Sequence, residues 1–218
     1  MSPQHRAAAG SAAAANQAFA DAYLPLSPAA QSAREHAADR GVSPIGPAAA
    51  ATLTFLAATL RAHAVAEVGT GTGVSAVALL AGMAPDGVLT SIDNETELQL
   101  AAREVLTDAG VPRQRARLIA GDALGVLPKL TDAAYDLVFI DGDPLEYVEY
   151  VAQAVRLLRS GGILVLHHAL WNGQVADPAN EDDEPLIVRE ALEAVRELEG
   201  FTSALLPVGD GLLVATKN

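Results

Sequence analysis

The sequence predicts an α/β fold in which a doubly wound, mostly parallel sheet of seven strands carries helices on both faces. Two observations predict it. Short apolar strands alternate with helices over residues 63–200, which favours parallel strands joined by right-handed crossovers. The chain then ends in two strands around Gly209-Asp210-Gly211, a hairpin pattern that places a C-terminal antiparallel pair at one edge of the sheet. At 218 residues the chain is long enough for one such domain with a sizeable core.

The N-terminal part of the chain is predicted to lie outside this domain. Residues 1–20 are an alanine-rich segment of low complexity, for which we expect a disordered tail. Residues 21–62 are expected to form an N-terminal helical extension, with helices over residues 28–40 and 48–61 that are separated by a turn. The domain with the sheet then covers residues 63–218.

The clearest local pattern is the segment AVAEVGTGTGVS, which begins at Ala64. An apolar strand contains Glu67 near its end, three glycines follow on alternate positions, and an apolar helix is expected from Val74 to Met83. Glycine tolerates positive φ and has no Cβ, so this spacing suits a tight strand-to-helix turn whose backbone approaches a ligand. The pattern departs from the dinucleotide fingerprint G-x-G-x-x-G, and an acid at the strand end favours a ligand with a cationic part over a pyrophosphate. A purely structural turn is the alternative.

The remaining elements follow in order. Further strands are expected at residues 87–93, 116–120, 135–140 and 163–166, and the hairpin strands at 202–207 and 212–216. Helices are expected after Asp93, after Gly121, from Glu146 to Arg159 and from about Leu186 to Glu199. Residues 171–185 are expected to form a long polar loop, whose acidic run at residues 181–184 is typical of a solvated surface.

Polar residues stand at the ends of successive strands, namely Glu67, Asp93, Asp122, Asp141 and His167. A single aspartate in such a place is commonly a helix N-cap. In an open α/β sheet, however, ligands bind beyond the carboxyl ends of the strands. Several such residues in sequence, starting from a glycine loop, therefore predict a ligand site at this edge.

The overall charge excludes several kinds of partner. A net charge of −13 argues against nucleic acid and against an anionic membrane surface as partners, since both require basic patches.

The composition also bears on the location of the protein. The chain has no cysteine, so disulfides and thiolate metal sites are impossible. No apolar run approaches the roughly 20 residues of a membrane span. We therefore expect a cytoplasmic protein.

Taken together, the motifs resemble the class I S-adenosylmethionine-dependent O-methyltransferases, specifically the bacterial relatives of catechol and caffeoyl-CoA O-methyltransferases. The resemblance extends from about Val42 to the C-terminus. Its main marks are AEVGTGTGVSAV, LTSID, AGDALGVLP, YDLVFIDGDP, RLLRSGGILVL, LWNGQVADP and LLPVGDGLLVA. It implies a Rossmann-like fold, methyl transfer from S-adenosylmethionine to a small hydroxylated, aromatic acceptor, and a homodimer formed through the N-terminal helices.

The resemblance also implies positions for the methyl donor. Its methionine part would be wrapped by Glu67, Gly69, Thr70, Gly71 and Gly73, with Ser75 holding the carboxylate. Asp93 would take the ribose hydroxyls, and Asp122 with Ala123 would border the adenine. Val42 would close over the donor and Asp141 would approach the methionine amino group. By the same resemblance, Asp141 and Trp171 would line the acceptor pocket.

The chain departs from the family at the metal and at the base. The metal-dependent members place an Asp at the end of the fourth strand and an Asp-Asn pair at the end of the fifth, which together bind Mg²⁺ or Ca²⁺. They also place a base lysine three residues after the first Asp. Here Asp141 is kept, whereas the pair is His167-His168 and the lysine position is Pro144. Because Mg²⁺ requires oxygen ligands and rarely accepts imidazole, we expect no such metal site.

Three interpretations of His167 and His168 stay open from the sequence. They are a strand-end pair without catalytic role, a metal-independent element in which one histidine deprotonates the acceptor hydroxyl, or a two-histidine site that binds Mn, Fe or Zn together with Asp141. Adjacent strand residues point to opposite faces, so a shared metal requires that the strand has already turned. Asp141, His167 and His168 are the catalytic candidates.

Two alternative functions are considered for the whole protein. The first is a sensor or scaffold that binds S-adenosylmethionine or S-adenosylhomocysteine without transferring methyl groups. The second, a nicotinamide oxidoreductase, is disfavoured by the glycine spacing.

Overall fold

Seven strands form one mixed sheet in the order β3-β2-β1-β4-β5-β7-β6 in the computed structural model, which describes residues 3–218 and side chains from residue 12 onward. The strands are β1 (Ala64–Val68), β2 (Val88–Asp93), β3 (Ala116–Ala120), β4 (Tyr135–Ile140), β5 (Leu158–Leu166), β6 (Phe201–Leu206) and β7 (Leu212–Lys217). The first five are parallel, and β7 pairs antiparallel with both β5 and β6. The predicted edge hairpin is confirmed.

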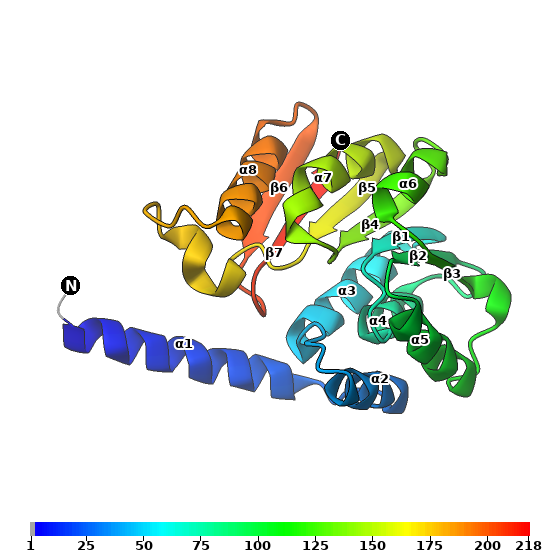
Figure 1. Cartoon of the computed structure of the whole chain (residues 1–218), viewed down its shortest axis with the longest axis horizontal. Helices are drawn as coiled ribbons and strands as arrows, with labels where there is room; N and C mark the ends of the chain where they lie inside the picture. Colours follow the sequence, from blue (N-terminus) through cyan, green and yellow to red (C-terminus); the bar gives the residue numbers. More distant parts are fainter. Residues whose placement is uncertain (1–2) are drawn as a thin grey trace.

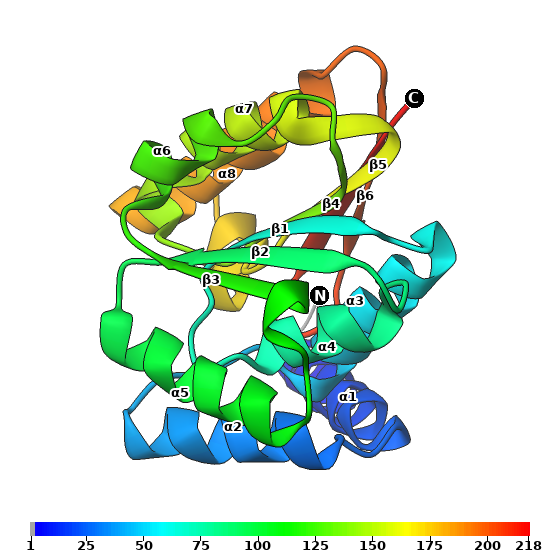
Figure 2. The same cartoon turned by 90° about the vertical axis from the view of Figure 1, so that its right-hand side faces the viewer.

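Helices cover both faces of the sheet, as Figure 2 shows. They are α1 (Pro3–Tyr23), α2 (Pro28–Asp39), α3 (Pro47–Leu60), α4 (Val74–Gly82), α5 (Thr96–Asp108), α6 (Ala123–Val126), α7 (Tyr147–Leu157) and α8 (Asp183–Glu197). The helices α2 to α5 lie on one face, and α6 to α8 lie on the other. None of the helices in the described part of the chain combines the length and apolar composition that a membrane crossing needs.

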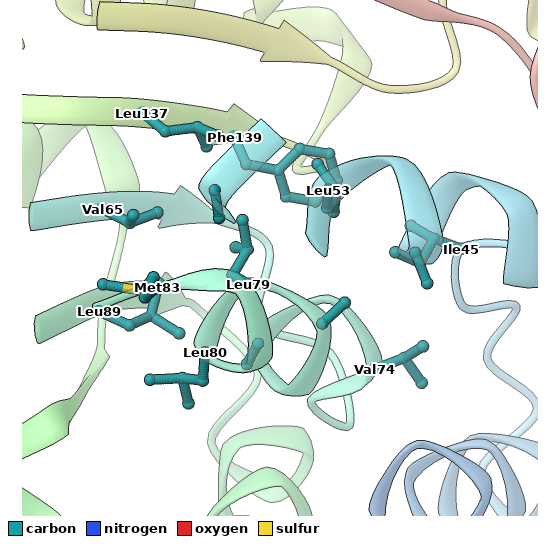
Figure 3. Packing of buried hydrophobic residues seen from close by; sticks show 14 of the residues in the cluster. Ile45, Leu53, Val65, Val74, Leu79, Leu80, Met83, Leu89, Leu137 and Phe139 are labelled. Carbon is teal, nitrogen blue, oxygen red and sulfur yellow. The ribbon is translucent and has the colours of Figure 1, made fainter. Parts of the chain in front are cut away.

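The strand pleat divides the apolar side chains between two cores. Val65, Leu137 and Phe139 are fully buried on the face that α3 and α4 cover. Their neighbours Val138 and Ile140 are buried on the opposite face, against α7 and α8. Figure 3 shows the first core through the labelled side chains Ile45, Leu53, Val65, Val74, Leu79, Leu80, Met83, Leu89, Leu137 and Phe139. Because both faces are packed, the strand ends are the part of the sheet left open for a ligand.

The order of the strands places a switch point beside the glycine loop. β1 lies between β2 and β4, so the crossovers from β1 and from β3 leave the sheet in opposite directions. Ligands in open α/β sheets bind in the crevice at such a point. The glycine loop, which follows β1 directly, therefore occupies the expected position.

The prediction of a disordered tail is wrong from Pro3 onward, because α1 covers residues 3–23; residues 1 and 2 lie outside the described part. Alanine has the highest helix propensity, so the composition that suggested low complexity also favours a helix. The second half of α1 is also tied to the domain. The carboxylate of Asp21 accepts from the amide of Ala48 at 2.9 Å, and the amide of Gly209 donates to the side chain of Gln17 at 3.2 Å. Figure 1 shows α1 extending from the body of the molecule.

Two boundaries differ from those predicted by three residues or more. β5 begins at Leu158 rather than at residue 163, because Leu158 already pairs with Tyr135 across an irregularity in the β4–β5 register. The expected polar loop at residues 171–185 contains a 3₁₀ segment, Trp171–Ala176, and α8 begins at Asp183. Asp183 and Glu184 occupy the first turn of α8, where acidic side chains stabilise the positive end of the helix dipole.

Candidate functional site at the carboxyl ends of the strands

Two adjoining cavities lie over the carboxyl ends of the parallel strands. Their volumes are about 280 Å³ and 240 Å³, and both are lined by Gly69, Asp93, Asp141 and Gly142. The larger cavity continues toward the N-terminal extension and the end of β5, and the smaller one toward the end of β3. They form one crevice with two chambers that meet at Gly69 and Asp141. The larger cavity is the first chamber and the smaller one is the second.

The glycine loop adopts the backbone that its spacing predicts. Gly69, Gly71 and Gly73 have φ values of 91°, 51° and 94°, which are left-handed conformations that side chains disfavour. A Cβ on Gly69 would lie 2.2 Å from the carbonyl oxygen of Asp141, so the two backbones are in direct contact. The amide of Asp141 also donates to the carbonyl of Val68 at 2.8 Å. The loop after β1 and the residue after β4 therefore hold each other in place.

Asp93 links the loop to β2. One carboxylate oxygen of Asp93 accepts from the amide of Gly71 at 2.8 Å, and the other accepts from the amide of Glu95 at 2.8 Å. The side chain lines both chambers. The family resemblance assigns Asp93 to the ribose hydroxyls, and a carboxylate about 20 residues after such a loop is typical of nucleotide-binding α/β folds.

Glu67 is fully buried beneath the loop. The hydroxyl of Ser91 donates to its Oε2 at 2.5 Å, whereas Oε1 has no hydrogen-bond partner among the described residues. Burial raises the pKa of Glu67 to about 8; the hydroxyls of Ser75 and Ser91 oppose this rise, and the carboxylates of Asp141 and Asp93 add to it. At neutral pH the carboxyl group is therefore mostly protonated, and a cation placed near it would favour its ionised form.

Asp141 and the two histidines meet at the end of β5. Nδ1 of His167 lies 2.8 Å from Oδ1 of Asp141, and Nε2 of His168 lies 3.7 Å from the same oxygen. The two imidazole rings are 4.0 Å apart between centroids. His168 has a φ of 53°, so the strand has turned at this residue and both rings approach Asp141.

The cluster does not fit the hard cation that the family resemblance implies. One nitrogen of each histidine and one oxygen of Asp141 lie within 4.8 Å of one another, but two of these three donors are imidazoles. Mg²⁺ and Ca²⁺ take oxygen ligands. Nδ1 of His167 is also engaged by the carboxylate of Asp141. The chain therefore lacks the oxygen ligands of a Mg²⁺ or Ca²⁺ site at this position.

The structure gathers most of the residues singled out in the sequence. The first chamber is lined by Val42, Gly69, Thr70, Gly71, Ser75, Asp93, Asp141, His168 and Trp171, and the second by Asp122 and Ala123 together with Asp93 and Asp141. Three residues do not line the crevice. Glu67 and His167 are buried beneath it, and Gly73 packs against Ala102 of α5.

Sequence reasoning missed three polar residues of the site. Gln99 and Ser91 are buried and continue the hydrogen-bond chain from Thr70 to Glu67. Asp210 lies 2.7 Å from Nδ1 of His168. The glycines on either side of Asp210 indicate only a hairpin turn, and the partner of Asp210 is 42 residues away, so no local pattern marks this residue.

Comparisons with known proteins point to one protein family. A protein-family model described as O-methyltransferase matches residues 30–218. A chain from Mycobacterium tuberculosis named a probable O-methyltransferase is 50% identical over 186 residues, which are 85% of this chain and 83% of that one. A crystal structure of a Corynebacterium glutamicum protein superposes with a TM-score of 0.85 at 34% identity, covering 91% of this chain and 94% of the other. The O-methyltransferase TomG from Streptomyces achromogenes, solved in complex with S-adenosylmethionine, gives a TM-score of 0.85 at 25% identity and covers 94% of this chain and 96% of its own.

The buried carboxyl of Glu67 predicts a pH-dependent stability. Because its pKa is higher in the folded than in the unfolded state, its contribution is complete below pH 4.5 and is lost as the pH rises through 8. Glu67→Gln cannot ionise, so the stability of this variant relative to the wild type should increase by about 3 kcal/mol between pH 6 and pH 9. Urea unfolding of both proteins at the two pH values measures the change, and a constant difference would contradict the assigned pKa.

Proposed function

The chain belongs to the O-methyltransferase family, and on this premise we propose that it methylates a hydroxyl oxygen of a small, uncharged or cationic aromatic acceptor without Mg²⁺. S-adenosylmethionine is the methyl donor of this family. The observation that carries the proposal is the acid-lined crevice, which has the partly exposed imidazole of His168 at one end and lacks the oxygen ligands of a Mg²⁺ or Ca²⁺ site.

The crevice fits a ligand with a positive charge and a nucleoside. The donor carries a positively charged sulfonium and an ammonium group. The crevice is lined by the carboxylates of Asp93 and Asp141, and Oε1 of Glu67, which has no hydrogen-bond partner among the described residues, lies beneath it. In our proposal the methionine part lies along Gly69, Thr70 and Gly71, with Ser75 at its carboxylate and Val42 over it. Glu67 lies beneath these residues, and Gly73 packs the loop against α5 without touching the ligand. The ribose meets Asp93 and the adenine meets Asp122 and Ala123 in the second chamber. Asp141 stands between the donor and the acceptor.

The charge of the crevice also restricts the acceptor. Among the described residues that line the two chambers, none is lysine or arginine, whereas Asp93, Asp122, Asp141, Asp143 and Glu146 are acidic. A coenzyme A thioester carries several phosphates and would meet repulsion here. The acceptor side of the first chamber instead presents Trp171, Pro144 and Ile45, which suit a small aromatic ring.

His168 is the proposed base. When bound, S-adenosylmethionine would supply a methyl group attached to a positively charged sulfur. The methyl carbon would form a bond to the acceptor oxygen as the bond between this carbon and the sulfur breaks. The acceptor O–H bond breaks at the same time, its proton goes to Nε2 of His168, and its electron pair stays on oxygen. Asp141 and Trp171 position the acceptor, and positioning accounts for much of the acceleration. His167 is buried and holds the carboxylate of Asp141.

The proposed reaction predicts a selectivity among acceptors. Purified protein should methylate uncharged phenols or catechols from labelled S-adenosylmethionine, and it should leave a phenolic acyl-coenzyme A thioester unmethylated. Activity should persist in EDTA, because no hard-metal site is present. Methylation confined to the thioester would contradict the acceptor class, and activity lost to EDTA and restored by Mn²⁺ or Zn²⁺ would contradict the metal-free base. Tight binding of S-adenosylhomocysteine without transfer to any phenol would favour the alternative, a donor-binding protein without methyltransferase activity.

The two histidines should differ in their effects on catalysis. His168→Ala should lower kcat by about 100-fold or more, since general base catalysis contributes on that scale, while binding of S-adenosylhomocysteine is unchanged. His167→Ala should lower thermal stability as well as kcat, because it leaves a buried cavity and frees Asp141. Calorimetric titration, steady-state kinetics and thermal unfolding separate the two variants. Full turnover in His168→Ala would exclude this residue as the base.

A homodimer through the N-terminal helices forms part of the proposal. Large apolar side chains are exposed there, with Phe19 74%, Tyr23 72% and Phe55 66% accessible. Such a concentration of exposed apolar surface is typical of a protein interface. Light scattering should give twice the chain mass, and Phe19→Ser combined with Phe55→Ser should shift the protein to the monomer. A monomeric wild type would contradict this part of the proposal.

A further inference from the structure

We propose that Asp210 is a positioning residue, which holds His168 in the tautomer with a proton on Nδ1 and leaves Nε2 free to accept the acceptor proton. The inference rests on the proposed function, because it names the partner of the base assigned there. Asp210 belongs to the turn between β6 and β7 and does not line either chamber. It therefore acts through His168 and not on the substrate.

The hydrogen bonds of Asp210 determine which nitrogen of His168 carries the proton. Oδ2 of Asp210 lies 2.7 Å from Nδ1 of His168, and Oδ1 accepts from the amide of Asn172 at 2.5 Å. An ionised carboxylate only accepts, so Nδ1 must be the donor. Nε2 lies 3.7 Å from Oδ1 of Asp141, which is too long for a hydrogen bond. The lone pair of Nε2 is thus available on the side of Asp141 and the first chamber.

The backbone holds the two residues together. The amide of Leu170 donates to the carbonyl of Asp210 at 2.9 Å, and the amide of Ala169 donates to that of Gly211 at 3.2 Å. Gly211 has a φ of 90°, and a Cβ there would lie 2.6 Å from the side chain of Leu170. The turn is therefore packed directly on the segment that follows β5, so the carboxylate has little freedom to leave His168.

The backbone of His168 indicates that its orientation is enforced. His168, Trp171 and Asn172 all have positive φ, with values of 53°, 44° and 52°. Residues other than glycine adopt this region at a cost, and such residues concentrate at functional sites where the surroundings hold them. The hydrogen bonds from the amides of Ala169, Leu170 and Asn172 to the turn that contains Asp210 stabilise this backbone conformation. Nothing in the packing of the core requires His168 itself, whose side chain is one-third exposed.

The other groups around His168 do not replace Asp210. Asp141 faces the opposite nitrogen, and its nearer partner is Nδ1 of His167. Trp171 meets the imidazole edge with a centroid distance of 5.5 Å and offers no acceptor. Tyr147 is buried, and burial followed by the charges of Asp141 and Asp210 raises its pKa, so it remains neutral. Asp210 is thus the carboxylate that both fixes the tautomer and stabilises the imidazolium once the proton has arrived.

Asp210→Asn tests this role sharply. The amide oxygen can keep the bond from Asn172, which turns the amide nitrogen toward His168 as a donor. Nδ1 must then accept, and the ring proton moves to Nε2, where it blocks proton transfer. We expect kcat to fall by about 100-fold or more, with the KM of both substrates and the affinity for S-adenosylhomocysteine within about threefold of wild type. Asp210→Glu should restore part of kcat, since it returns a carboxylate.

A structural role would give different results. If Asp210 acts through His168, the double variant His168→Ala/Asp210→Asn should be as slow as His168→Ala alone, whereas independent damage would multiply the two losses. The loss of kcat in Asp210→Asn should also be smaller when the acceptor is a nitrophenol that is already ionised, because no proton has to be removed from such an acceptor. Asp86→Asn is the matched control, because Asp86 forms an exposed pair with His63 at 3.4 Å outside the site, and it should leave kcat unchanged. Equal losses for ionised and neutral acceptors would overturn the proposal.

A measurement without an acceptor separates this inference from the proposed function. Long-range ¹H–¹⁵N spectra, with His168 assigned through His168→Gln, should show the proton on Nδ1 in the wild type and on Nε2 in Asp210→Asn. Failure to methylate any acceptor would contradict the function but would leave this result intact. A wild-type His168 with its proton on Nε2 would overturn the inference even if the enzyme is active.

Discussion

The close contact between the backbone of Gly69 and the carbonyl of Asp141 is the constraint on which the site depends. It permits no side chain at position 69, because a Cβ would overlap the carbonyl oxygen, and it joins the loop after β1 to the end of β4. The carboxylate of Asp141 then reaches His167 and approaches His168 after β5. One contact between two neighbouring strand ends thereby sets the distance between the proposed donor site and the proposed base.

The electrostatics of the crevice follow from the same arrangement. Acidic groups gather at the ends of β1, β2 and β4, and their mutual repulsion adds to burial in raising the pKa of Glu67. A ligand that brings positive charge relieves this repulsion, whereas an anionic ligand increases it. The two histidines take the place of oxygen ligands for a hard cation, and each is engaged by a carboxylate, Asp141 for His167 and Asp210 for His168. This arrangement is the one that the proposed metal-free proton transfer requires.

Local patterns predict the sheet well and the chemistry only in part. β3 and β4 begin and end at the predicted residues, because short apolar runs flanked by turns leave little choice of boundary. Alanine composition was misleading for α1, since low complexity and high helix propensity coincide there. The positions of Gly69, Asp93 and Asp141 follow from their places at strand ends. Asp210 could not be found in this way, because its contact with His168 joins residues that are 42 positions apart in the sequence.

A crystal structure of the complex with S-adenosylhomocysteine and a catechol, recorded with anomalous data sensitive to transition metals, tests the central claim most directly. We expect the sulfur near Gly69 and Asp141, and an acceptor hydroxyl within hydrogen-bond distance of Nε2 of His168. We also expect no anomalous signal between Asp141 and the two histidines. A metal at that position, or an acceptor hydroxyl held away from His168, would contradict the metal-free base mechanism.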